Sequence, residues 1–240
     1  MDFKYSGIIL NKKDVSEADR IYTILTLEAG KIRVLGKGVR RPNAKLAGYL
    51  EPLTYAEIFV AKGKGMGKIT SSIVIDNLPG LKADLDSLSN IFYSFGILEK
   101  IISEQEEDRA VFCLLLEYLQ SAEKINAKAA DKYKKDILMM GFLFKLLAEA
   151  GYRFEVEKCV LCGKKLKPEK NYFSAAQGGI LCVNCAEGER RKIVIENESI
   201  KFIRIFLKNK IENLVKLSAD RKNTRNLQAV MKEFLDWVVK

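Results

Sequence analysis

Four of the five cysteines stand as two Cys-x-x-Cys pairs, Cys159 with Cys162 and Cys182 with Cys185, and nineteen residues separate the pairs. Two thiolates on one tight turn can share a metal ion, and a second pair alongside completes the four-sulfur tetrahedron that zinc prefers. Four sulfur ligands leave no coordination position for a substrate water. The spacing therefore predicts one structural Zn²⁺ ion.

Two disulfides, or four cysteines of an ordinary core, are the alternatives to a metal site. The first ten residues, MDFKYSGIIL, lack the basic leader and long apolar run of a signal peptide. We therefore expect a cytoplasmic protein, and disulfides are rare in that reducing compartment. No segment approaches the roughly 18 consecutive apolar residues that cross a bilayer, so we expect no membrane insertion.

Several kinds of enzyme are excluded by what the sequence lacks. The chain has no histidine, and therefore no Ser-His-Asp triad, no Cys-His nucleophile and no histidine-ligated catalytic metal. Near the glycines at 63–67, Lys62 and Ile69 stand where a phosphate-binding P-loop needs Gly and Ser or Thr, and Lys68 replaces the third Gly of a dinucleotide motif. The acidic segment EQEED at 104–108 is interpreted as a solvated helix junction, because consecutive carboxylates on a helix point in different directions.

Basic side chains concentrate in the first third of the chain, which favours a polyanionic partner. The net charge is +10, and residues 31–68 hold nine basic side chains against two acidic ones. The loop GKGVRRPNAK at 36–45 combines glycines, which allow close backbone approach, with Arg40 and Arg41, whose forked donors fit phosphate. A second basic segment, KGKGMGK, occupies 62–68. The candidate DNA-binding side chains are Lys31, Arg33, Lys37, Arg40, Arg41, Lys45, Lys62, Lys64 and Lys68. The alternative is a pair of solvated loops that only aid solubility.

The elements that carry the basic loops are short strands. Apolar, β-branched and aromatic residues predict strands at 3–10, 21–27, 31–37, 54–61 and 69–75. Five strands with one long basic loop and one glycine-rich loop are typical of a small closed barrel; we expect an OB-fold, with an SH3-like barrel as the alternative. In the third strand, alternation places Lys31, Arg33 and Leu35 outside and Ile32 and Val34 inside. The barrel aromatics are either core residues or base-stacking platforms: Tyr22, Tyr49, Tyr55 and Phe59.

The elements that carry the cysteines are helices. The apolar period changes at Leu78-Pro79-Gly80, where we place the boundary between a domain at 1–79 and a helical domain at 80–240. Apolar stripes predict helices near 85–102, 111–119, 137–147, 200–207 and 227–238. Asp84 is expected to start the first, and Asn223 or Thr224 the last. The cysteine module at about 152–191 lies between the third and fourth helices. The predicted fold class is α+β.

Four segments of this chain, taken together, resemble the RecO family of bacterial DNA repair and recombination mediators. They are EADRIYTILT at 17–26, GKIR at 30–33, KGVRRP at 37–42 and GYLEPL at 48–53. The order of barrel, helices, two Cys-x-x-Cys pairs and closing helices fits that family along the whole length. One departure is Ala44, because the family commonly has serine there, so one phosphate hydrogen bond is expected to be missing.

The resemblance implies an OB-fold joined to a helical domain with a zinc knuckle, and a protein that is not an enzyme. It implies binding of single- and double-stranded DNA, annealing of complementary strands without ATP, and, with the partner RecR, loading of RecA onto DNA coated by single-strand-binding protein. The C-terminal tail of that protein is a further implied partner. The implied location is the cytoplasm, at the nucleoid.

The resemblance also implies roles for individual residues. It places Lys37, Arg40 and Arg41 in DNA contacts, and the four paired cysteines on zinc. Two alternatives stay open: a metal-dependent nuclease with a zinc staple, and a pure interaction adaptor whose basic charge meets a protein partner.

Overall fold

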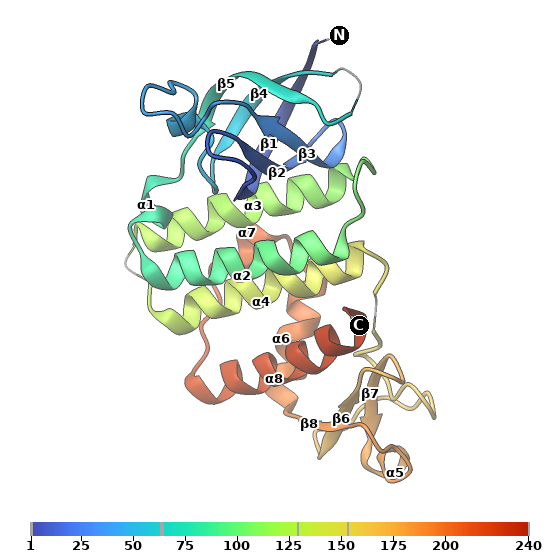
Figure 1. Cartoon of the computed structure of the whole chain (residues 1–240). Helices are drawn as coiled ribbons and strands as arrows, with labels where there is room; N and C mark the ends of the chain where they lie inside the picture. The colour runs from blue at the N-terminus through green and yellow to red at the C-terminus, as the bar shows by residue number, and fades with distance from the viewer. Residues whose placement is uncertain (1, 63–64, 129, 153, 240) are drawn as a thin grey trace. The chain divides into compact units, whose positions relative to one another are not determined.

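The chain folds into a barrel followed by helices, with a small second sheet inserted among them (Figure 1). The structure, a computed structural model, describes residues 2–62, 65–128, 130–152 and 154–239. Contacts divide the chain into two compact units, unit 1 at Met1–Glu123 and unit 2 at Lys124–Lys240. Within the described part, no helix combines the length and the apolar character that a membrane crossing requires. The fold class is α+β, as predicted.

Unit 1 begins with a closed five-stranded barrel. Its strands are β1 (Asp2–Asp14), β2 (Arg20–Thr26), β3 (Gly30–Gly36), β4 (Tyr55–Ala61) and β5 (Lys68–Asp76), with a 3-10 turn, η1 (Ala47–Tyr49), between β3 and β4. The strand order is β1-β2-β3-β5-β4, in which β1 pairs antiparallel with β2 and β4, and β3 meets β5 in parallel to close the barrel. This is the order of an OB-fold, and the five predicted strands are confirmed.

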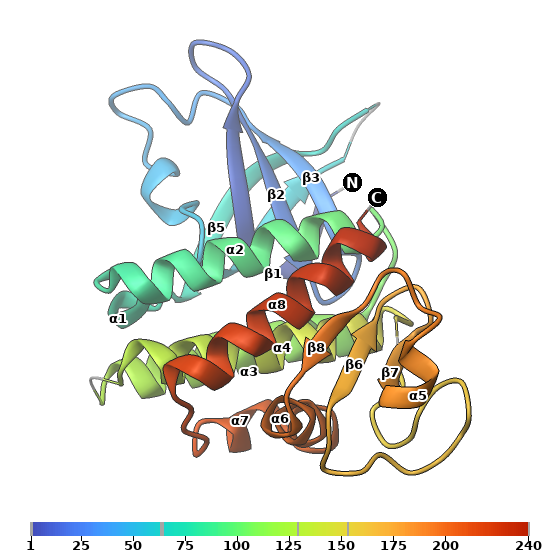
Figure 2. The ribbon, with the colours of Figure 1, turned by 90° about the horizontal axis from the view of Figure 1, so that it is seen from below.

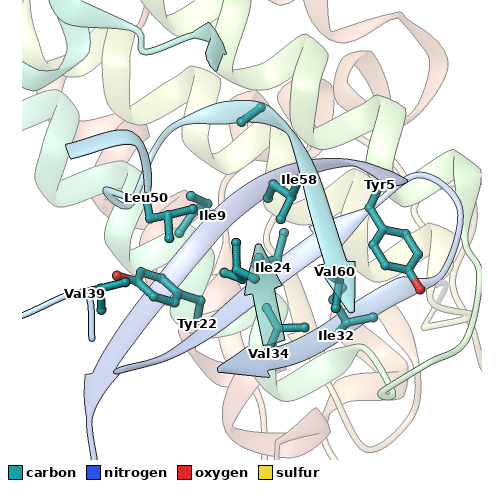
Figure 3. Packing of buried hydrophobic residues seen from close by; sticks show 12 residues of the cluster. Tyr5, Ile9, Tyr22, Ile24, Ile32, Val34, Val39, Leu50, Ile58 and Val60 are labelled. Carbon is teal, nitrogen blue, oxygen red and sulfur yellow. The ribbon is translucent and has the colours of Figure 1, made fainter. Parts of the chain in front are cut away.

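The barrel core follows from residue alternation along the strands. Every second residue of β4 is buried, and Ile9, Ile24 and Ile58 have no exposed surface (Figure 3). In β3 the predicted inner residues Ile32 and Val34 are buried, and Arg33 is exposed. Packing of this apolar interior is what holds the loops at the barrel ends in place.

Lys31 lies on the face of β3 opposite Ile32 and Val34, as predicted, but this face is covered there and Lys31 is not exposed. Its side chain is only 6% exposed, and its ammonium donates to the backbone carbonyl of Glu99 at 2.5 Å. The backbone of Lys31 also forms a bridge with Glu104 and accepts a hydrogen bond from Gln105. Burial lowers the pKa of Lys31, although nearby Glu104 and Glu99 oppose that shift. A side chain placed in this way cannot contact a DNA phosphate in the folded protein.

Three helices complete unit 1: α1 (Pro79–Lys82), α2 (Leu85–Ile101) and α3 (Arg109–Asn126), whose last turn passes into unit 2. Asp84 caps α2 by accepting a hydrogen bond from the backbone N–H of Ser87, as predicted. The apolar stripe that predicts this helix is only partly buried; it consists of Leu85, Leu88, Phe92, Phe95, Leu98 and Ile102. Phe95 and Leu98 are buried, but Leu85 is 81% and Phe92 46% exposed.

The compact unit extends beyond the expected domain boundary at 79. The Glu123 carboxylate of α3 accepts hydrogen bonds from the backbone of Gly80 and Leu81, both at 2.8 Å. The rings of Tyr55 in β4 and Phe112 in α3 lie 6.1 Å apart, edge to face. The change from strand to helix does fall at 76–79. The division at 79 stays a prediction about domains, and the first helices pack with the barrel.

Unit 2 combines helices with a three-stranded sheet of order β7-β6-β8. Its elements are α4 (Lys132–Glu149), β6 (Asn171–Ser174), β7 (Gly179–Cys182), α5 (Val183–Ala186), β8 (Ile193–Ile195), α6 (Asn197–Lys208), α7 (Ile211–Leu214) and α8 (Arg221–Val238). The last helix begins earlier than predicted, because Asp220 rather than Asn223 or Thr224 caps it. The single-turn helix α5 lies beside the sheet (Figure 2).

Two helical glycines give a matched test of the packing. In α4, a Cβ at Gly141 would lie 2.4 Å from Leu214 Cδ1 and 3.3 Å from Phe206 Cδ1, whereas in α2 a Cβ at Gly96 would meet no atom within 4 Å. Alanine favours a helix by about 1 kcal/mol over glycine, but overpacking a core costs about 1–3 kcal/mol. We expect Gly141→Ala to lower the free energy of unfolding and Gly96→Ala to raise it by up to about 1 kcal/mol. Denaturant titration measures both, and equal effects would contradict this packing.

Candidate metal centre and candidate nucleic-acid interface

The four cysteines of unit 2 come together at one point. Their sulfur atoms all lie within 4.8 Å of one another, and Cys162 Sγ is 3.9 Å from Cys182 Sγ. In a tetrahedron of sulfur ligands with bonds of about 2.3 Å, sulfurs are about 3.8 Å apart. All four thiols are free, so the disulfide alternative is not realised. The donor set and its spacing fit a tetrahedral metal ion.

Local turns bring each pair into position. After Cys159 the chain folds back so that Gly163, with φ of 70°, donates to the Cys159 carbonyl at 2.9 Å, and Cys159 donates to the Lys164 carbonyl at 2.8 Å. Cys182 ends β7 and Cys185 lies in α5, one turn later. The Cys182 N–H is 3.4 Å from Cys159 Sγ, which links the two turns. A left-handed residue after the first pair is what glycine supplies at little cost.

The pKa values of two of the four thiols are shifted in opposite directions, because their hydrogen-bond partners differ. Burial opposes ionisation of Cys159, but hydrogen bonds from the backbone N–H groups of Cys162, Cys182 and Leu161 outweigh it and lower the pKa of Cys159 to about 6. Hydrogen bonding with the thiols of Cys182 and Cys162 raises the pKa of Cys185 to about 12. Neighbouring thiolates repel one another, and a dication bound by the four sulfurs would offset that repulsion and favour the deprotonated thiols.

The module that carries the cysteines is anchored to the helices of unit 2 by aromatic packing. The ring of Phe154 lies 4.8 Å from Phe234 of α8, 5.5 Å from Phe173 of β6 and 5.4 Å from Phe144 of α4. Phe173 has no exposed surface. Phe154 and Phe173 therefore attach the module that carries the cysteines to α4 and α8.

Four of the nucleic-acid candidates of unit 1, Lys37, Arg40, Arg41 and Lys45, lie on the loop between β3 and β4, residues 37–54, which we call the β3–β4 loop. It is fastened to the β1–β2 loop, residues 15–19, and the two extend from the same end of the barrel (Figure 2). Gly38 N–H donates to Asp19 Oδ1 at 2.7 Å, and Arg40 N–H donates to the Ala18 carbonyl at 3.0 Å. Gly38 has φ of 70°, and Arg41 N–H closes a turn on its carbonyl at 3.2 Å. The basic segment is therefore ordered before any ligand arrives.

The basic side chains of this end fall into two classes. Arg40 is engaged, because its Nε lies 3.3 Å from Asp14 Oδ2 and its Nη1 donates to the Ser16 carbonyl at 2.7 Å. Arg33 is engaged as well, with its Nε 2.9 Å from Glu104 Oε1. On the β3–β4 loop and at the start of β5, four exposed candidates have no ion-pair partner among the residues that the structure describes: Lys37, Arg41, Lys45 and Lys68. These four can meet phosphates without first giving up a carboxylate.

The second basic segment is seen only in part. Lys62 is exposed, and its ammonium lies 4.8 Å from the centre of the Phe3 ring and 5.7 Å from that of Tyr5. Such a cation–π contact holds the lysine over the barrel and leaves its charge available. Lys64 lies outside the described residues. Lys68 opens β5, next to Gly67, whose carbonyl accepts from Leu35 N–H at 2.8 Å.

The four aromatic candidates for base stacking separate by exposure. Tyr22 has no exposed surface and belongs to the barrel core (Figure 3), while Tyr55 packs on Phe112. Phe59 is half-buried on β4. Tyr49 is 51% exposed at the end of η1, in the β3–β4 loop. Only Tyr49 therefore combines exposure with a place among the unpaired basic residues.

Two charged residues that flank the β1–β2 loop, Asp14 and Arg20, are not among the site residues predicted from the sequence. Asp14 and Arg20 are cross-strand partners in β1 and β2, and Arg20 Nε lies 2.7 Å from Asp14 Oδ1. The hydrogen bond and charge of Arg20, with smaller contributions from Arg40 and Lys12, hold the pKa of Asp14 below its usual value, although burial opposes this. The polar run at 11–14 has no apolar alternation, and β1 was expected to end at 10.

The acidic segment at 104–108 has structural contacts. Glu104 pairs with Arg33, and Asp108 caps α3 by accepting from Val111 N–H at 3.0 Å. Within the described residues, the four cysteines are the one group of at least three Cys, Asp or Glu side chains close enough together to hold a metal ion. The contacts of this segment agree with its interpretation as a helix junction.

Comparison with protein families gives two adjacent matches. Residues 1–78 match the family described as Recombination protein O N terminal, and residues 82–240 match Recombination protein O C terminal. The gap between the two matches coincides with the start of α1.

Individual relatives match along nearly the whole chain. The DNA repair protein RecO of Dehalococcoides mccartyi strain CBDB1 is 30% identical over 238 residues, which cover 99% of this chain and 91% of that protein. The protein of the same name from Desulforamulus reducens is 25% identical over 235 residues, 98% of this chain and 89% of that protein. That from Acetivibrio thermocellus is 31% identical over 211 residues, 88% of this chain and 81% of that protein.

Proposed function

The chain belongs to the RecO family of DNA repair proteins, and from that premise we propose that it is a DNA-binding mediator of recombination rather than an enzyme. It binds single- and double-stranded DNA through the β3–β4 loop and the neighbouring basic residues of the barrel. The observation that carries this proposal is that four exposed basic side chains on this loop and at the start of β5, Lys37, Arg41, Lys45 and Lys68, have no ion-pair partner among the described residues. Their spacing along one ordered loop and the adjoining β5 supports contact with successive phosphates.

Annealing follows from charge neutralisation. Complementary strands repel each other through their phosphates, and a basic surface that holds both lowers this repulsion so that bases can pair. No side chain has to transfer a proton or a phosphoryl group, and no ATP is needed. In the cell the protein acts with RecR to load RecA onto DNA coated by single-strand-binding protein, whose C-terminal tail it also binds. This places its work in the cytoplasm, at the nucleoid.

The four cysteines bind one Zn²⁺ ion in this proposal. Sulfur donors in a tetrahedral set of this size support zinc, which supplies a cross-link between two turns of unit 2. Cys159, Cys162, Cys182 and Cys185 hold the ion, and the buried Cys159 also accepts the Cys182 N–H. The metal stabilises the module and takes no part in DNA chemistry.

Mixing labelled complementary oligonucleotides with the protein, without nucleotide, tests the function. The expected result is a protein-dependent increase in the rate of duplex formation, seen by energy transfer between labels on the two strands. Strand cleavage after addition of Mg²⁺ would instead indicate the nuclease alternative, and unchanged single strands would indicate the interaction adaptor. A preparation heated above its unfolding temperature is the control.

A further inference from the structure

One carboxylate in the barrel sits between two arginines, next to the candidate DNA-binding loop. Asp14 Oδ1 lies 2.7 Å from Arg20 Nε, and Asp14 Oδ2 lies 3.3 Å from Arg40 Nε. The Arg20 side chain comes from β2 and the Arg40 side chain from the β3–β4 loop, so two separate elements direct their guanidinium groups at one anion. The three charges leave a net charge of +1 at this point.

We propose that Arg20 and Arg40 form a binding site for one DNA phosphate, and that Asp14 occupies this site in the free protein as an internal competitor. The inference rests on the proposed function and adds Arg20 and Asp14 to its machinery. A phosphodiester group offers two non-bridging oxygens, which share one negative charge, to two guanidinium groups, and the Asp14 carboxylate now provides the same arrangement. Binding of DNA then exchanges one anion for another.

The exchange is possible because Asp14 is more exposed than either arginine, and because other contacts hold Arg40 in place. The Asp14 side chain is 49% exposed, compared with 22% for Arg20 and 35% for Arg40. Exposed ion pairs stabilise a protein weakly, so releasing the carboxylate into water costs little. Arg40 keeps its place through the Ser16 carbonyl, at 2.7 Å from Nη1, and through its own N–H on the Ala18 carbonyl.

The neighbouring residues lead a DNA strand past this site. Arg41 and Lys37 flank Arg40 on the same loop and have no ion-pair partner in the described part of the chain. The hydrogen bond from Gly38 N–H to Asp19 Oδ1, at 2.7 Å, holds the β3–β4 loop against the β1–β2 loop, which follows Asp14 in the chain. A strand that binds Arg41 therefore brings its next phosphates close to Arg40. Asp14 lowers the affinity of this strand and makes its release easier.

The test compares two substitutions that remove the same negative charge. Asp14→Asn frees both arginines, whereas Glu17→Gln removes an exposed carboxylate of the β1–β2 loop that makes no ion pair among the described residues. Binding of a fluorescent oligothymidine is followed by anisotropy at fixed salt. We expect Asp14→Asn to tighten the dissociation constant by about fivefold and Glu17→Gln by less than about twofold. Since the expected effect is an increase in DNA affinity, partial unfolding of the variant cannot produce it.

A second pair of variants ties the gain to the arginines. When Arg20→Gln and Arg40→Gln are both present, adding Asp14→Asn should tighten the dissociation constant by no more than Glu17→Gln does. The arginines with which Asp14 pairs are then absent, so removing its charge frees no phosphate-binding group. Equal gains from Asp14→Asn and Glu17→Gln in the original chain, or weaker binding by Asp14→Asn, would overturn the inference while the proposed function stands. An unsubstituted protein that binds no DNA would instead overturn the proposed function itself.

Discussion

Replacing Arg41 by glutamate is expected to weaken the binding of single-stranded DNA by about 30-fold. Arg41 is exposed on the ordered β3–β4 loop and has no ion-pair partner among the described residues. A hydrogen bond to a charged group contributes about 2 kcal/mol, which corresponds to that factor, and glutamate adds repulsion of the phosphate. The corresponding change at Arg40 is expected to be smaller, because Arg40 must first give up Asp14.

The salt dependence of binding separates phosphate contact from other causes of this loss. Each phosphate contact with single-stranded DNA contributes about −0.7 to the slope of log affinity against log salt, so the Arg41→Glu slope should be shallower by about that amount. Lys128→Glu, at an exposed lysine of unit 2, is the charge-matched control and should change affinity by less than about threefold. The loss should be equal for all base sequences. A loss confined to certain sequences, or an equal loss in the control, would contradict phosphate recognition by Arg41.

The strands were predictable from the sequence because their pattern depends on local alternation. Residues such as Ile32 and Val34 point into the barrel wherever the strand lies, since successive side chains of a strand alternate between its faces. Lys31 lies on the opposite face, as this alternation predicts, but it is buried for a reason that is not local. The segment from Glu99 to Gln105, some seventy residues later, covers this end of β3 and takes up both its side chain and its backbone.

Helix boundaries and buried faces were less predictable, because several answers fit the same local sequence. Asp220, Asn223 and Thr224 can all cap a helix, and the structure uses Asp220. On α2, Leu85 and Phe92 share an apolar stripe with Phe95 by spacing, yet the buried face combines Phe95 with Ile91, which lies off that stripe. Which stripe is buried depends on the partner that packs against it, and a single helix sequence does not contain that information.

The two candidate sites, the cysteine cluster and the basic β3–β4 loop, also differ in how far the sequence predicts them. Metal-ligand spacing is a property of short turns, so the sequence predicts which four sulfur atoms come together, and the structure brings them within 4.8 Å. The state of each basic residue is a property of its neighbours. Nothing in the segment GKGVRRPNAK distinguishes Arg40, which is paired with Asp14, from the unpaired Arg41. Arg40 differs from Arg41 because the pairing register of β1 with β2 and the hydrogen bond between Gly38 and Asp19 bring Arg40 close to Asp14.

Replacing Cys159 by serine is expected to remove the metal and unfold the cysteine module while DNA binding by the barrel persists. Cys159 is the most buried of the four ligands, at 1% exposed, and its sulfur also lies 3.4 Å from the Cys182 N–H. Structural zinc in zinc-finger peptides contributes an apparent binding free energy of about 10–16 kcal/mol at neutral pH, and Cys159→Ser removes one of the four ligands on which this depends. The aromatic contacts of Phe154 and Phe173 with Phe234 of α8 then lose their support from the module.

The measurements are zinc content by mass spectrometry, thermal unfolding, and oligonucleotide binding. Cys113→Ser is the matched control, because Cys113 is an exposed free cysteine on α3 outside the cluster. We expect Cys113→Ser to keep one zinc ion per chain and the original unfolding temperature, and Cys159→Ser to lose both. DNA affinity should change by less than about threefold in either variant, because the β3–β4 loop takes its order from the barrel. If the unsubstituted protein contains no zinc after purification under reducing, chelator-free conditions, the metal assignment is wrong. Loss of DNA binding by Cys159→Ser, with the barrel still folded by hydrogen exchange, would show instead that the metal module contributes directly to the DNA-binding surface.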